Sequence, residues 1–187
     1  MLVIRMNGVD AVKYFFGIVP PLSIYEKLMS VRNQYHYSGV EPHITVKLSY
    51  GTGTMLPVNW MSECKRIIEG FRSFSVSVGE LRYFGDKDVL YIGAHSPELI
   101  ELHRKLVAVF EPTEEQTKRY FELNLYIPHL TVAKKESLSE EILEEMERTL
   151  FPHFQDRQTF DVHEIRLYAR DDQNKTFQKY EDIQMTR

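Results

Sequence analysis

The five-residue stretch PHITV at positions 42–46 recurs almost unchanged as PHLTV at positions 128–132. Only the aliphatic residue after the histidine differs, and the two histidines stand 86 residues apart (129 minus 43). At average residue usage, a second histidine would gain the same kinds of neighbour by chance with odds below roughly one in a thousand. The repeat therefore indicates two halves of one site.

Each copy has the pattern of a β-strand that starts at a proline. Proline favours an extended backbone, and the residues after it alternate between polar and apolar with period two. This alternation predicts that His43, Thr45 and Lys47 share one face while the aliphatic residues between them face a core. His129 and Thr131 share a face in the same way. Side chains two residues apart on a strand start about 6–7 Å apart, so one bound phosphate could contact both.

Helical and strand patterns alternate along both halves of the chain. Strand patterns cover residues 14–19, 43–49, 74–78, 81–84, 89–94, 121–127, 160–169 and 176–183. Helical patterns cover about 20–39, 57–70, 96–110 and 137–150. A phase slip between Val162 and Ile165 predicts a bulge in one strand. We therefore expect an α+β fold with internal pseudo-symmetry, in which residues 1–187 form a single two-lobed domain.

Composition and charge narrow the class of protein. The chain has 187 residues, of which 43% are hydrophobic and 27% charged, as in ordinary soluble globular proteins. A formal net charge of −4 argues against a protein that binds long nucleic acid through many phosphate contacts. A small nucleotide or short RNA bound in a locally basic groove remains compatible with this charge.

Other features point to a cytoplasmic protein that needs no metal or cofactor. Cys64 is the only cysteine, and the apolar start at Met1–Arg5 is too short for a signal peptide. No stretch approaches the ~20 apolar residues of a membrane span, so we expect no membrane association. Two histidines and two threonines fall short of a zinc ligand set. The Gly51–Thr54 loop lacks the lysine and helix of a P-loop, so we interpret it as a flexible turn.

The doubled His-x-Thr phrase resembles the motif of the two-histidine (2H) phosphoesterase superfamily, and the chain length resembles that of its bacterial 2′-5′ RNA ligase-like branch. The resemblance implies two lobes whose antiparallel sheets face each other around a central groove, with helices outside. It also implies that His43, Thr45, His129 and Thr131 meet at the floor of that groove. Members of the family act on cyclic phosphates, 2′-5′ linkages or RNA 3′ ends, and some mainly bind.

These residue types suit the opening of a phosphodiester. Two opposed imidazoles can act as general base and general acid, since the ordinary histidine pKa of about 6.5 lets both forms coexist near neutral pH. We expect His43 and His129 to be catalytic, Thr45 and Thr131 to bind substrate oxygens, and Lys47 to add a second-line phosphate contact. Which histidine is the base and whether the protein ligates or cleaves stay open, as does its oligomeric state. The alternatives are a non-catalytic nucleotide or RNA-end binding module and, less favoured, an interaction protein that uses the acidic helix.

Overall fold

The computed structural model describes residues 13–50, 57–170 and 176–187 of the chain. Its helices are α1 (Leu22–Gln34), α2 (Trp60–Glu69), α3 (Pro97–Val109), α4 (Glu114–Arg119) and α5 (Glu140–Phe154), with a 3₁₀ turn, η1, at Leu123–Leu125. Its strands are β1 (Lys13–Ile18), β2 (Ile44–Leu48), β3 (Phe74–Phe84), β4 (Val89–His95), β5 (His129–Lys134), β6 (Gln158–Val162), β7 (Glu164–Arg170) and β8 (Gln178–Gln184).

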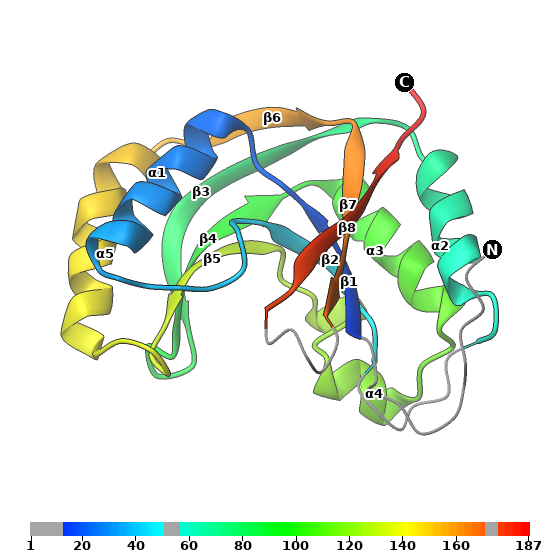
Figure 1. Cartoon of the computed structure of the whole chain (residues 1–187), viewed down its shortest axis with the longest axis horizontal. Helices are drawn as coiled ribbons and strands as arrows, with labels where there is room; N and C mark the ends of the chain where they lie inside the picture. The colour runs from blue at the N-terminus through cyan, green and yellow to red at the C-terminus, as the bar shows by residue number, and fades with distance from the viewer. Residues whose placement is uncertain (1–12, 51–56, 171–175) are drawn as a thin grey trace.

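The strands form one curled antiparallel sheet, a half-barrel, in the order β6-β3-β4-β5-β2-β1-β7-β8. The two strands that follow the repeated prolines, β2 and β5, lie at its centre and are joined by the pair Ile44 and Leu130. Figure 1 shows α1 and α5 covering one half of the sheet, while α2 and α3 cover the other. The expected α+β fold with two pseudo-symmetric halves is confirmed, and the halves join into a continuous sheet.

The same irregularity interrupts both central strands one residue after the threonine. Opposite β1, Thr45 pairs with Gly17 and Lys47 pairs with Phe16, so Val46 has no partner and forms a β-bulge. Opposite β4, Val132 is skipped in the same manner between Thr131 and Ala133. A bulge adds a residue to one strand and so reverses the alternation of faces beyond it. The repeat in sequence is therefore also a repeat in backbone shape.

A side chain from a neighbouring helix satisfies the carbonyl of each bulged valine. The His103 imidazole on α3 donates from Nδ1 to the Val46 carbonyl at 2.7 Å. The Arg32 guanidinium on α1 donates from Nε to the Val132 carbonyl at 3.0 Å. Both side chains are buried, at 2% and 4% exposed, where an unpaired carbonyl would be costly.

The bulge explains why Lys47 does not share the face of His43. Beyond Val46 the alternation is reversed, and Lys47 turns into the core, where its side chain is 0% exposed. Its ammonium forms an ion pair with Glu122 at 2.7 Å and lies 3.9 Å from the centre of the Tyr50 ring. We expected Lys47 to contact substrate, but the structure places it in a buried ion pair, where its role is structural.

Residues 121–127, which alternate like a strand, form no strand. Helix α4 ends at Arg119, just before this stretch, and the turn η1 lies within it. Phe121 and Leu123 adopt left-handed backbone angles with φ of 53° and 55°. The Leu123 amide donates to the Nε2 of His103 at 3.0 Å instead of to a neighbouring strand. Phe121 and Ile127 stay 69% and 53% exposed, so the alternating apolar residues do not mark a buried face.

The expected single strand over 160–169 is two strands in different halves of the sheet. β6 pairs with β3 and β7 pairs with β1, with the change of partner at His163. The phase slip marks this corner rather than a bulge. Met1–Arg5 and the Gly51–Thr54 loop lie outside the described residues. Within the described ranges, no helix is long and apolar enough to span a bilayer.

Replacement of Arg32 should destabilise the fold. Arg32 also donates to the carbonyls of Thr131 at 2.6 Å and Val40 at 2.8 Å, so Arg32→Met leaves three backbone acceptors without their charged donor. We expect the free energy of unfolding to fall by roughly 3 kcal/mol in urea titrations. The exposed Arg104→Met on α3 is the control, expected to stay within about 0.5 kcal/mol of the parent. Equal stabilities for the two variants would contradict this role.

The structural role of Lys47 in the ion pair with Glu122 can be tested by mutation. Lys47→Met leaves the buried Glu122 carboxylate without its cation and should cost roughly 3–5 kcal/mol of unfolding free energy. The double variant with Glu122→Gln should recover part of that loss, because no buried charge then remains unpaired. The control is Lys105→Met, which removes the cation of an exposed ion pair with Glu101 on α3. We expect it to change stability by less than about 0.5 kcal/mol. A stable Lys47→Met protein with weakened phosphate binding would restore the substrate role.

Candidate active site

The four motif side chains surround the junction of β2 and β5. Ile44 and Leu130 pair across it and are both 0% exposed, so they form the core side. Because antiparallel strands run in opposite directions, this register sets Thr131 beside His43 and Thr45 beside His129. All four flanking side chains are half-buried and lie on the opposite face from the two aliphatic residues. The structure thus brings the predicted histidines and threonines together and leaves Lys47 apart from them.

The two imidazoles are held by equivalent hydrogen bonds, each to the backbone carbonyl two residues earlier in the chain. Nδ1 of His43 lies 2.7 Å from the carbonyl oxygen of Glu41, and Nδ1 of His129 lies 2.8 Å from that of Ile127. A carbonyl oxygen only accepts, so Nδ1 carries the proton in both rings. Nε2 of each neutral ring therefore holds the lone pair that could take a proton from water.

Each imidazole also packs against a stacked pair of aromatic rings. Phe15 and Tyr168 stack with ring centres 4.3 Å apart, and the His43 ring lies 4.6 Å from Phe15. On the other half, Phe84 and Tyr91 stack at 3.9 Å, and the His129 ring lies 4.9 Å from Phe84. These contacts restrict the rotation of the rings about the axis that the hydrogen bond fixes.

The surroundings favour the neutral form of both histidines. Burial lowers the pKa of His43 to about 4, against the opposing effect of its hydrogen bond to the Glu41 carbonyl. The charges of Arg32 and His129 lower it further, so the two imidazoles lie within electrostatic range. Burial also lowers the pKa of His129, again opposed by its backbone hydrogen bond. The direction of both shifts favours neutral imidazoles near neutral pH.

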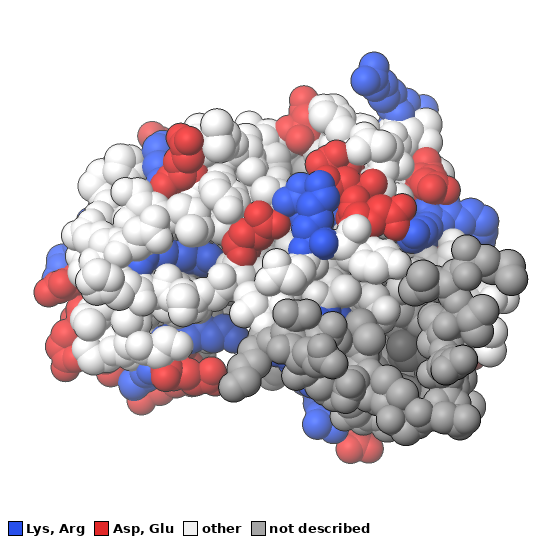
Figure 2. Space-filling model, in the orientation of Figure 1, with Lys and Arg blue, Asp and Glu red and all other residues white. Residues whose placement is uncertain are grey.

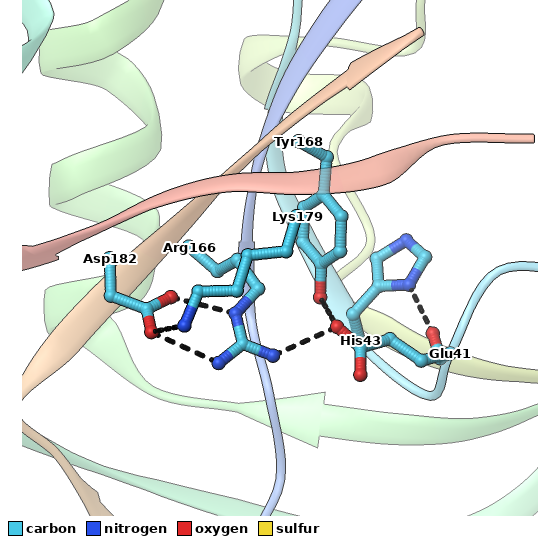
Figure 3. Close-up of polar contacts among 6 residues, drawn as sticks. All are labelled: Glu41, His43, Arg166, Tyr168, Lys179 and Asp182. Atoms are coloured by element: carbon cyan, nitrogen blue, oxygen red, sulfur yellow. Dashed lines mark hydrogen bonds and ion pairs between the residues drawn. The ribbon is translucent and has the colours of Figure 1, made fainter. Parts of the chain in front are cut away.

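Sequence reasoning missed a charged network that adjoins the first histidine. The Glu41 carboxylate accepts hydrogen bonds from the Tyr168 hydroxyl at 2.7 Å and the Arg166 guanidinium at 2.9 Å (Figure 3). Arg166 is itself bound to Asp182 on β8. Figure 2 shows the wider setting, where acidic and basic side chains are interspersed over β7 and β8. Glu41 is adjacent to the Pro-His phrase, but only the sheet register reveals its partners, which lie more than 120 residues later in the chain.

Comparison with known proteins agrees with this architecture. The model of the 2′-5′ RNA ligase superfamily matches residues 20–174. A protein of Bacillus cytotoxicus that bears the general name phosphoesterase is 28% identical over 127 residues, covering 66% of this chain and 70% of the relative. A relative of the same name from Bacillus cereus is 28% identical over 121 residues, covering 63% of this chain and 66% of its own length.

Solved structures share the fold. A protein of Thermus thermophilus has a TM-score of 0.62 at 14% identity, over 92% of this chain and 97% of its own. Escherichia coli LigT complexed with phosphate has a TM-score of 0.60 at 14% identity, over 96% and 100%. LigT complexed with 3′-AMP has a TM-score of 0.58 at 15% identity, over 94% and 99%. The match of the superfamily model over most of the chain shows that the chain belongs to the 2′-5′ RNA ligase superfamily of two-histidine phosphoesterases, as its repeated phrase indicated.

Proposed function

We propose that the protein is a metal-independent phosphoesterase that acts on a small nucleotide or an RNA end through His43 and His129. Its reaction is the hydrolysis of a 2′,3′-cyclic phosphodiester or the cleavage or joining of a 2′-5′ bond. The observation that carries the proposal is the matched pair of imidazoles at the β2–β5 junction, each with Nδ1 committed to a backbone carbonyl and Nε2 left for chemistry.

Hydrolysis of a cyclic phosphodiester needs two proton transfers on opposite sides of phosphorus. One imidazole takes a proton from water through Nε2 while the water oxygen bonds to phosphorus. The bond between phosphorus and a ribose oxygen breaks, and the other imidazole gives that oxygen a proton. Each transfer contributes typically ~10²–10⁴-fold to the rate. The roles reverse in the ligation direction, so either histidine serves as the base.

Substrate binding would itself prepare the acid. Burial lowers the pKa of both histidines and so favours the neutral form of both rings. A phosphate anion beside them favours the protonated form of one ring, which then carries the proton that the leaving oxygen needs. The hydroxyls of Thr45 and Thr131 would donate to non-bridging oxygens and hold phosphorus in line between the rings.

The proposed substrate class rests on the size and chemistry of the site. The pairing of Ile44 with Leu130 sets the two His-x-Thr phrases side by side, which supports a single phosphate shared between them. Structures of the related fold in LigT are complexed with phosphate and 3′-AMP, which supports a nucleotide as the substrate. A net charge of −4 supports a small nucleotide or short RNA over long nucleic acid. We propose a cytoplasmic location on the grounds given by the sequence.

The proposal is tested by product formation in the presence of a chelator. Wild type and the His43→Ala and His129→Ala variants are assayed against 2′,3′-cyclic nucleotides, ADP-ribose cyclic phosphate and 2′-5′ oligoadenylate. We expect wild type to turn over at least one class and each variant to lose ~10²–10⁴-fold in kcat. The exposed His153→Ala on α5 is the matched control, expected to retain full activity.

Two results would count against the assignment. Undiminished activity in either histidine variant would remove that imidazole from the chemistry. Tight nucleotide binding by wild type, with no product from any substrate, would favour the alternative of a non-catalytic binding module.

A further inference from the structure

The two histidine phrases differ in the residue whose carbonyl holds the imidazole. That residue is Glu41 in the first phrase and Ile127 in the second, and only the former has a side chain that can carry charge. We propose that Arg166, together with Tyr168, is a positioning residue for His43 that acts through Glu41. The catalytic part of this inference rests on the proposed function, whereas the link between Arg166 and the imidazole does not.

The contacts form an unbroken path from β7 to the ring. The Arg166 Nη1 and the Tyr168 hydroxyl both donate to Oε1 of Glu41, at 2.9 and 2.7 Å. The backbone carbonyl of the same glutamate accepts from Nδ1 of His43 at 2.7 Å. The Tyr168 ring lies 5.5 Å from the imidazole, so this residue touches both ends of the path (Figure 3). Fixing the Glu41 side chain thus fixes the carbonyl that orients the imidazole.

Arg166 is suited to this role because its own position is fixed. Its Nε and Nη2 donate to the two carboxylate oxygens of Asp182, at 2.7 and 3.1 Å, and Lys179 also binds that carboxylate. This bidentate contact occupies one edge of the planar guanidinium and leaves Nη1 for Glu41. The Arg166 side chain is only 18% exposed, which limits screening by solvent.

The other half of the sheet contains an arginine at the matching position. Gly17 on β1 pairs with both Thr45 and Arg166. In the same way, Tyr91 on β4 pairs with both Thr131 and Arg82. The sheet register therefore makes Arg82 the counterpart of Arg166.

Within the described residues, the hydrogen bonds and ion pairs of this counterpart do not involve the second histidine phrase. Arg82 forms its ion pair with Glu80, and its side chain is 59% exposed. The ring that packs on His129 where Tyr168 packs on His43 belongs to Phe84, which has no hydroxyl to donate. Over the part of the chain that the structure describes, this polar support is found only beside the first histidine, and Arg82 is a matched control for Arg166.

The charged and titratable groups around His43 act on it directly or through this path. The charges of Arg32 on α1, Glu41 before β2 and His129 on β5 act on the imidazole itself. Tyr25 on α1, Tyr168 and Arg166 on β7 interact with Glu41, while Asp182 on β8 binds Arg166 and Lys179. Among these effects, the charge of Glu41 raises the pKa of His43, behind the larger effects of burial, the backbone hydrogen bond and the charge of Arg32. Arg166 balances that carboxylate, so its removal exposes the imidazole to an uncompensated negative charge.

The experiment follows the imidazole signals of His43 and His129 by NMR as pH is varied, which requires no turnover. In Arg166→Gln we expect the His43 midpoint to move to higher pH while that of His129 stays in place. The double variant with Glu41→Gln should return the His43 midpoint toward wild type, because the uncompensated carboxylate is gone. Arg82→Gln should leave the His43 midpoint unchanged.

Tyr168→Phe provides the decisive variant if Arg166→Gln fails to fold, since it keeps the ring and removes one donor to Glu41. We expect the same direction of shift for His43, smaller in size. In an active protein, kcat of Arg166→Gln should fall by up to roughly 100-fold with a smaller change in KM. An unchanged His43 midpoint in the folded variants, or equal shifts of both histidines, would overturn the inference. Absence of activity in wild type would instead count against the proposed function alone.

Discussion

The pairing of Ile44 with Leu130 is the constraint on which the site depends. This is the paired position between β2 and β5, the strands at which two four-stranded halves join into one sheet, and it sets the residues on either side of it in fixed register. Both aliphatic side chains are fully buried, so a slip of one residue would turn them outward and carry the histidines into the core. Burial of the aliphatic pair therefore holds each histidine of the repeat beside the threonine of the other copy.

Around that junction the two halves share the same β-bulge but differ in the residues that follow and precede it. Each central strand has a bulge at the valine after the threonine, and a buried side chain from a helix binds the bulged carbonyl. Beyond the bulges the two halves differ: Lys47 is paired with Glu122 in one half, while Ala133 takes the equivalent place in the other. The residues before the histidines differ as well. The Glu41 carboxylate is bound by side chains of β7, whereas its counterpart Ile127 has no carboxylate. The symmetric parts create a two-sided site, and the asymmetric parts give its two histidines different surroundings.

Much of this could be predicted from sequence because the signals are local. The repeated phrase, its proline start and the helix caps lie within a few residues of one another, and they yielded the α+β fold and the residues that meet at the junction. The errors arose where tertiary contacts override a local period. Val46 fits an alternating strand as well as any neighbour, so nothing nearby reveals the bulge that turns Lys47 inward. The alternation over 121–127 looks like a strand until His103 is seen to bind the Leu123 amide. Likewise, the partners of Glu41 are fixed only by sheet register.

The central claim is that both Nε2 atoms and both threonine hydroxyls face one phosphate. A crystal structure of the protein with inorganic phosphate bound tests it most directly, with the His129→Ala variant crystallised in the same way for comparison. The account predicts one phosphate within hydrogen-bond distance of Nε2 of His43 and of His129, with each Nδ1 still on its backbone carbonyl. A phosphate that contacts only one histidine, or that occupies the same position when His129 is absent, would contradict it.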